Sequence, residues 1–282
     1  MITYLAQHKT IAILLLTVYF LGLVYFHDAA TVVADWLKYK LTLSYYNLSL
    51  LISGLALSSV TGYFLWRTVI KHPERRMFFL WFLITILAMI LALFTMMVVN
   101  MEAIHYLQYA ILAVLIFPLV QRYEDAFIGA TILGMVDEMY QYLVLNPSFK
   151  YFDFNDIILN MLGAGACLLV MAAASFPESR NPRKWYRSSS YFFIGIIILL
   201  GIIISGNFPV TFFPVPVDPN GWHWFSLYRQ NLPDQFWTFL YGSRYYHILR
   251  PWEGIMVMSV LTFFYARIDY FYAKALTSKS TT

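Results

Sequence analysis

Eight long apolar runs constrain this chain more than any other feature of its sequence. A helix of about 20 apolar residues crosses the hydrocarbon core of a bilayer. Inside lipid the backbone N–H and C=O groups must be satisfied within their own segment, so runs of this length predict helices. They lie near residues 10–26, 47–66, 77–99, 103–120, 126–145, 157–175, 190–206 and 253–272. The sequence therefore predicts an all-α, polytopic bundle with about eight transmembrane spans.

The composition excludes a soluble enzyme. The 282 residues are 60% hydrophobic and only 12% charged, whereas soluble domains carry about a quarter charged residues. Aromatic residues make up 19% of the chain, with 22 Tyr and 8 Trp, and such side chains favour the headgroup level of a bilayer. The net charge of +4 indicates cytoplasmic loops rather than nucleic-acid binding. The single Cys167 rules out an intrachain disulfide.

Basic residues predict the orientation. They cluster in two links, at residues 67–76 and 180–187. With eight spans, both links share a side with the two termini, which carry further basic residues: Lys9, Arg267, Lys274 and Lys279. Because cytoplasmic loops are enriched in Lys and Arg, we expect both termini in the cytoplasm.

Two segments outside a central core carry their own expectations. Residues 1–43 combine a retained anchor span with a stretch, Asp28 to Leu43, that fits either an amphipathic interfacial helix or an extended loop. Residues 44–176 form the core, and residues 177–282 add two spans. The loop at 207–251 is rich in proline and aromatic residues, so we expect an extracytoplasmic cap with a short helix near Leu232 to Tyr241.

Polar residues on three successive spans are the main functional signal. The fourth span starts with Glu102, His105 and Tyr109, whose spacing places them on one helix face. The fifth carries Asp137, Glu138 and Gln141, and the sixth carries Asp156, Asn160 and Gly163. Charge at membrane depth costs a few kcal/mol, so it is usually functional.

The predicted topology places these residues in one layer, within roughly 12–15 Å of the outer surface at 1.5 Å rise per residue. We therefore expect a polar pocket that opens to the outer leaflet, with His247 and Glu253 as candidates to extend it from above. A helix-fastening network of interhelical hydrogen bonds is the alternative. The pair Gly163 and Gly165 is interpreted as a close helix crossing.

Within this layer, His105 is the best general acid or base, because small shifts bring imidazole across neutral pH. Glu138 or Asp137 is expected to orient it. Alternatively, Glu138, Asp156 and His105 form a divalent cation site. No nucleophile stands out, so the sequence leaves open whether any reaction is catalysed. The other candidate ligand-binding residues are Glu102, Tyr109, Gln141, Asp156 and Asn160.

The same residues resemble the VanZ-like membrane protein family over about residues 100–170. The matching pieces are Glu102-x-x-His105-x-x-x-Tyr109, Asp137-Glu138-x-x-Gln141 and Asp156-x-x-x-Asn160-x-x-Gly163. This chain has Tyr140 where the family often has His, and Lys150 as the cationic substitute near a family Pro-x-Arg, which makes Lys150 a further ligand-binding candidate. The resemblance implies the bacterial cytoplasmic membrane, the cell envelope and low-level resistance to glycopeptide antibiotics, notably teicoplanin.

Three functions remain open at this point. The first is a site for a lipid-linked or amphiphilic envelope ligand, with membrane lipids or a lipid-linked precursor as partners. The second is a non-enzymatic scaffold or accessory subunit of a larger membrane complex, docking through the 207–251 loop and the last two spans. The third is a proton- or ion-coupled transporter, which the sequence disfavours because the acids lie on one side with no matching acids in the inner half.

Overall fold

The computed structural model describes residues 1–97, 100–145, 151–174, 188–202, 235–239 and 245–279. Its regular elements in this part of the chain are helices, as predicted. The α-helices are α1 (Ile2–Gln7), α2 (Lys9–Tyr25), α3 (His27–Lys71), α4 (Arg76–Thr95), α5 (Ile104–Val120), α6 (Tyr123–Tyr140), α7 (Phe154–Ala173), α8 (Ser189–Ile202) and α9 (Pro251–Lys279). Short turns precede α4 (η1, Pro73–Arg75) and α5 (η2, Asn100–Ala103), and a π-helical turn follows α6 (η3, Gln141–Leu145). Each of the eight apolar runs overlaps one of the helices α2 to α9.

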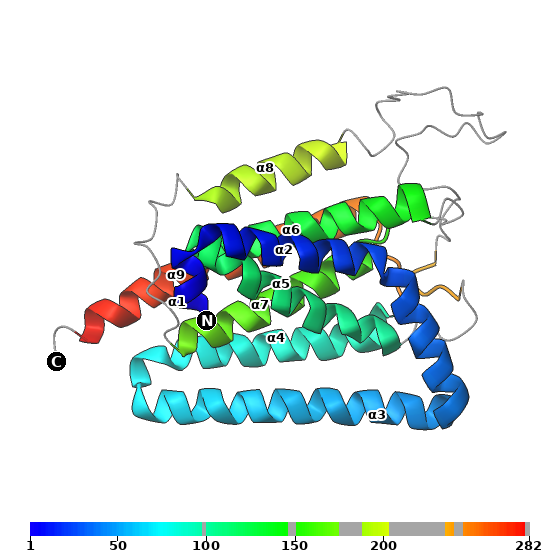
Figure 1. Ribbon diagram of the computed structural model, residues 1–282, viewed down its shortest axis with the longest axis horizontal. Coiled ribbons are helices and arrows are strands. Elements are labelled where there is room, and N and C mark those ends of the chain that lie inside the picture. The colour runs from blue at the N-terminus through cyan, green and yellow to red at the C-terminus, as the bar shows by residue number, and fades with distance from the viewer. Residues whose placement is uncertain (98–99, 146–150, 175–187, 203–234, 240–244, 280–282) are drawn as a thin grey trace.

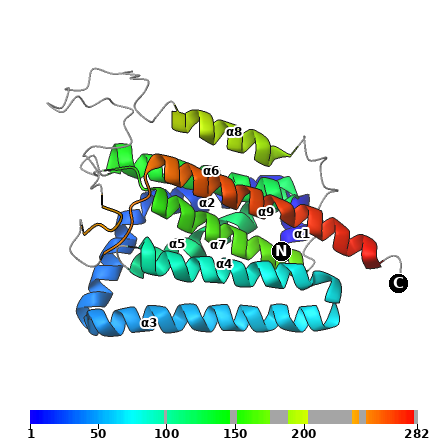
Figure 2. The same ribbon diagram turned by 180° about the vertical axis from the view of Figure 1, so that it is seen from behind.

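Helices α2 to α9 run broadly side by side and alternate in direction, so both chain termini lie at the same end of the bundle (Figures 1 and 2). Four described segments are long and apolar enough to cross a membrane: Tyr45–Lys71, Pro73–Thr95, Phe154–Ala173 and Pro251–Lys274. Three shorter apolar helices accompany them, Lys9–Tyr25, Ile104–Val120 and Ser189–Ile202. The chain therefore has the architecture of a helical membrane protein.

Helix α7 forms the centre of the bundle. In its most apolar 18-residue stretch 83% of the residues are buried, and the helix packs against α4, α5, α6 and α9. Glycine makes this possible at one crossing, because a Cβ atom on Gly163 would lie 2.3 Å from the carbonyl oxygen of Tyr106 on α5. A Cβ atom on Gly165 would meet the ring of Tyr265 on α9. The close helix crossing predicted at these two glycines is thus confirmed.

Helix α3 has two parts that meet at a kink at Thr42, where φ is 61°. The first part confirms the helical alternative for the Asp28–Leu43 stretch. It crosses the end of the bundle (Figure 1) and leaves Trp36 and Tyr39 exposed, as an interfacial helix would. The second part, Tyr45–Lys71, lies at the edge of the bundle next to α4 (Figures 1 and 2). In its most apolar 18-residue stretch only 6% of the residues are buried.

The short helix expected near Leu232 to Tyr241 is wrong over the part that the structure describes. Residues 235–239 form a bend, and Thr238 exchanges two backbone hydrogen bonds with Tyr246 at 2.9 and 3.1 Å. The chain pairs with itself here because the segment returns to the bundle, where the His247 backbone N–H donates to Thr95 at 2.7 Å. The rest of the aromatic loop lies outside the described residues, apart from 245–250.

Candidate functional site

His105 lies at the second position of α5, and side chains of α7 hold both of its ring nitrogens. Nδ1 lies 2.9 Å from Oδ1 of Asn160, and because that carbonyl oxygen accepts, Nδ1 donates. Nε2 lies 3.6 Å from Oδ2 of Asp156. A proton on Nε2 or on Oδ2 makes this contact attractive. If neither atom is protonated, the lone pairs of the two atoms face each other. The His105–Asp156 pair is therefore suited to hold and release a single proton.

Helix α6 contributes the second half of the cluster. The Tyr109 hydroxyl of α5 donates to Oδ2 of Asp137 at 3.1 Å. One turn further, Gln141 donates to Oε1 of Glu138 at 3.3 Å. Gln141 opens the π-helical turn η3, and such turns are rare and frequently lie at functional sites. Gly134 lets the helices approach, since a Cβ atom there would lie 3.1 Å from the Tyr109 ring and 3.2 Å from Nδ2 of Asn160.

The cluster is almost fully buried, and two of its polar atoms are unsatisfied. Asp137 is 3% exposed and Asn160 only 1% exposed. Oδ1 of Asp137 and Nδ2 of Asn160 have no hydrogen-bond partner among the described residues. Buried polar atoms are nearly always paired, so each such atom needs an explanation. The side chain of Asp156 keeps 16% of its surface exposed and marks the most accessible edge of the cluster.

The structure thus brings together most of the residues singled out in the sequence. The contacts of His105 with Asn160 and Asp156 and the Tyr109–Asp137 hydrogen bond meet at the His105 and Tyr109 rings, whose centroids lie 6.4 Å apart. Glu138 and Gln141 pair next to Asp137. The ring of His105 is oriented by Asn160 and Asp156, while Asp137 and Glu138 orient Tyr109 and Gln141. Glu102 lies half-buried in η2. Lys150 lies outside the described residues.

The geometry does not favour the divalent cation that the acids suggested. A protein site for such an ion combines several ligands at coordinating distance. Among the described residues, no group of three or more His, Cys, Asp or Glu side chains is placed to hold a metal ion. Glu138, Asp156 and His105 are close neighbours in the fold without forming a closed ligand set.

Asn155 is a structural residue of the site that the sequence analysis missed. Its amide donates to the carbonyl oxygens of Met96 at 2.9 Å and His247 at 2.8 Å, and its Oδ1 accepts from the Leu249 N–H at 3.0 Å. Two distant segments, the end of α4 and residues 247–249, therefore meet at the start of α7. In the sequence, the only sign of this role is that Asn155 precedes Asp156 at a helix start. An Asn at that position by itself indicates a helix cap. His247 of this segment and Glu253 in the first turn of α9 were the candidates to extend the pocket, and their Nε2 and Oε2 atoms lie 3.2 Å apart.

Asp153 precedes α7 and caps it, with Oδ1 accepting from the Asn155 N–H at 2.9 Å. Burial, reinforced by the nearby carboxylate of Asp156, raises the pKa of Asp153 from 3.8 to about 7. Because the pKa of Asp153 is raised in the folded state, its contribution to the stability of the fold is complete below its unfolded-state pKa. That contribution is lost as the pH rises through about 7.

We therefore expect Asp153→Asn to remove this pH dependence, since Asn keeps the capping oxygen but cannot ionise. The melting temperature of the variant, measured in detergent, should approach or exceed that of the wild type as pH rises from about 4 to about 8. Asp35→Asn, at an exposed position on α3, is the matched control. Parallel curves for wild type and Asp153→Asn would contradict the expectation.

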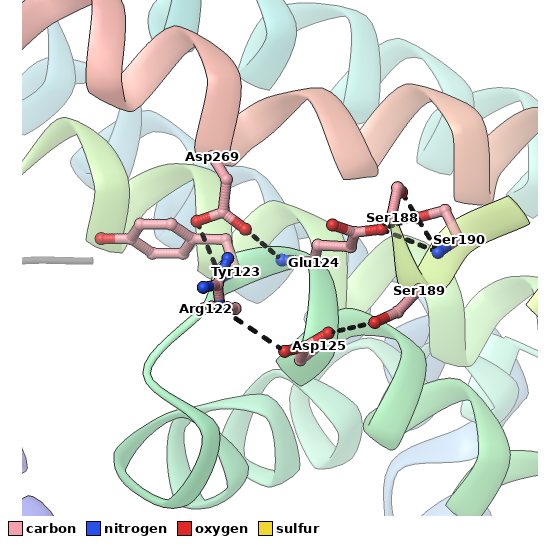
Figure 3. A network of polar contacts seen from close by, with 8 residues as sticks. All are labelled: Arg122, Tyr123, Glu124, Asp125, Ser188, Ser189, Ser190 and Asp269. Carbon is pink, nitrogen blue, oxygen red and sulfur yellow. Dashed lines mark hydrogen bonds and ion pairs between the residues drawn. The ribbon is translucent and has the colours of Figure 1, made fainter. Parts of the chain in front are cut away.

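A second polar network lies at the opposite end of α6 (Figure 3). Asp269 of α9 accepts from the backbone N–H groups of Tyr123 at 3.1 Å and Glu124 at 2.9 Å, and so caps α6. Glu124 accepts from both Ser188 and Ser190 hydroxyls and from the Ser190 N–H, and so holds the start of α8. The bundle therefore has buried acids at this end, where the sequence analysis expected no acids to match those of the polar cluster. Their hydrogen bonds identify them as helix caps.

Comparisons with known proteins give this chain no relative: no family model matches it, and neither a curated protein nor a solved structure matches it significantly.

Proposed function

We propose that this protein is a multi-pass cell-membrane protein whose polar cluster binds the headgroup of an amphiphilic or lipid-linked cell-envelope ligand. In this proposal helices α2 to α9 cross the bilayer eight times. Both termini and the basic turns face the cytoplasm, as Lys and Arg placement favours. The cluster of His105, Asp137 and Asp156 then lies toward the outer leaflet of a bacterial cytoplasmic membrane, in line with the VanZ-like resemblance.

The observation that carries the proposal is the pair of unsatisfied atoms. Oδ1 of Asp137 can accept a hydrogen bond and Nδ2 of Asn160 can donate one, and both atoms are buried. A ligand hydroxyl or amide, which both donates and accepts, would satisfy both atoms at once. Such groups are abundant on sugar and peptide headgroups. A hydrocarbon tail on the same ligand would remain in the surrounding lipid.

The His105–Asp156 pair adds a proton that could be moved to or from such a headgroup. The separation of 3.6 Å between Nε2 and Oδ2 is longer than a hydrogen bond, and such contacts often tighten when a ligand binds. The roles of these side chains are then binding and proton positioning. A helix-fastening scaffold is the competing proposal, because burial and interhelical hydrogen bonds also serve that purpose.

Co-purification tests the proposal. We expect the wild type, purified in mild detergent, to retain an amphiphile that mass spectrometry of its lipid extract detects. Asp137→Asn should reduce that amphiphile about 10- to 100-fold, the usual effect of losing a hydrogen bond to a charged group. Cells carrying Asp137→Asn should also lose any teicoplanin tolerance that the wild type confers.

Asp35→Asn is the control, since Asp35 is exposed on α3 and pairs with Lys38 of the same helix. Identical lipid extracts from the wild type, Asp137→Asn and Asn160→Ala, with all three equally folded, would reject the ligand site. That result would leave the scaffold function as the better account.

A further inference from the structure

An apolar groove runs between the outlying part of α3 and α4, far from the polar cluster. Its volume is about 430 Å³, within the range of ligand sites. Its walls include Leu55, Ser58, Gly62 and Trp66 on α3, and Phe79 and Phe82 on α4. No part of the proposed headgroup site contributes to it. The groove is therefore a separate feature of the molecule.

The sequence of α3 explains why the groove exists. Small residues, Ser58 and Gly62, face α4 where larger ones would fill the space, and a Cβ atom on Gly62 would lie 3.9 Å from the Phe82 ring. Trp66 closes one end against Phe79, with ring centroids 5.8 Å apart. From Leu55 to Trp66 the groove is about 16 Å long at 1.5 Å per residue. That length matches one leaflet of the hydrocarbon core, which is about 30 Å thick in total.

Basic side chains gather at the Trp66 end of the groove. Arg67, Lys71 and Arg76 are exposed there. Arg67 lies over the ring of Tyr63, 6.0 Å from its centroid. Arg75 is engaged in a different contact, donating to the carbonyl oxygen of Ala173 at 2.9 Å. The carboxylate of this turn, Glu74, lies 3.4 Å from His72. Three cationic side chains thus lie at the end of the apolar groove, where α3 ends and α4 begins.

We propose that this groove binds an acyl chain of an anionic phospholipid, whose phosphate lies against Arg67, Lys71 and Arg76. The apolar groove has the length of one leaflet and so matches the acyl chain, and the cationic side chains at its end match the phosphate. Basic pockets between transmembrane helices bind anionic headgroups. A second copy of the chain fits less well. A two-fold interface on this surface would place the same basic residues of both copies close together.

Native mass spectrometry of the full-length protein tests this site, with phosphatidylglycerol and phosphatidylcholine of identical chains as probes. We expect the wild type to retain phosphatidylglycerol about tenfold better than phosphatidylcholine. The double variant Arg67→Gln/Lys71→Gln should lose this preference while still binding both lipids. Gly62→Leu, which fills the channel, should lose both. Gly54→Leu is the matched control, because a Cβ atom on Gly54 meets nothing within 4 Å.

Equal retention of the two lipids by the wild type would overturn the proposal, and so would unchanged binding in Gly62→Leu. A wild-type dimer that Gly62→Leu converts to a monomer would assign the groove to a second copy instead. Should Gly62→Leu not fold, quenching of tryptophan fluorescence by brominated lipids replaces it. The difference in fluorescence between the wild type and Trp66→Phe gives the emission of Trp66. Brominated phosphatidylglycerol must then quench this emission more than brominated phosphatidylcholine does. Asp137→Asn should leave these results unchanged, so the two proposals can fail separately.

Discussion

Replacing Gly163 with Ala is expected to destabilise the protein by about 3 kcal/mol or more, the upper range for overpacking a closely packed core. The added Cβ atom would lie 2.3 Å from the backbone oxygen and 2.6 Å from the Cα atom of Tyr106. Backbone atoms cannot rotate away as a side chain can, so α5 must move as a unit. Thermal unfolding in detergent, followed by size-exclusion chromatography, measures the loss.

This substitution should also disturb the candidate site. His105 precedes Tyr106 on α5, and Asn160 lies one turn before Gly163 on α7. Separating the two helices therefore lengthens the 2.9 Å contact between His105 and Asn160. Gly165→Ala should cost less, because its Cβ atom meets the ring of Tyr265, a side chain, rather than backbone.

Gly195→Ala on α8 is the control, since a Cβ atom there meets nothing within 4 Å. Equal melting temperatures for Gly163→Ala and Gly195→Ala would show that α5 and α7 do not cross as closely as described.

Asn155→Ala is expected to give the second largest loss of stability, again about 3 kcal/mol, although it removes only a small side chain. Its amide satisfies three backbone groups, those of Met96, His247 and Leu249. Each buried backbone group left unsatisfied costs about 1–3 kcal/mol. The segment before α9 should then come away from the start of α7, and proteolysis in the 235–250 region should become faster.

Asn47→Ala on α3 is the matched control for this experiment, because Asn47 is only half-buried. The melting temperature and the rate of limited proteolysis are the two measurements. If Asn155→Ala unfolds at the same temperature as Asn47→Ala and resists protease equally well, the three hydrogen bonds of Asn155 contribute little to holding this segment.

The polar cluster shows how far sequence reasoning reaches in a membrane protein. His105, Asp137, Asp156 and Asn160 were identified because charged and amide side chains in apolar runs are rare and costly. Their common depth followed from counting residues along alternating helices. The pairing of particular atoms could not be obtained in this way, since several partners lie at the same depth on three helices. That choice depends on helix rotation, which the packing at Gly134 and Gly163 fixes.

The opposite end of the bundle illustrates the limit. Glu124 and Asp269 lie near the ends of apolar runs in the sequence, where a carboxylate is usually solvated, so nothing indicated that they are buried. Only the meeting of α6, α8 and α9 turns them into helix caps (Figure 3).

The sequence by itself determined that the chain is helical and where its helices lie. Apolar runs of about 20 residues leave the backbone no other means of satisfying its hydrogen bonds in lipid. It also singled out Asp28 to Leu43, for which it left an interfacial helix and an extended loop open. Tertiary structure alone decided which polar atoms meet and that Asn155 joins three segments. It also decided that the groove between α3 and α4 stays open. These features depend on contacts between residues far apart in the chain, and no local pattern encodes them.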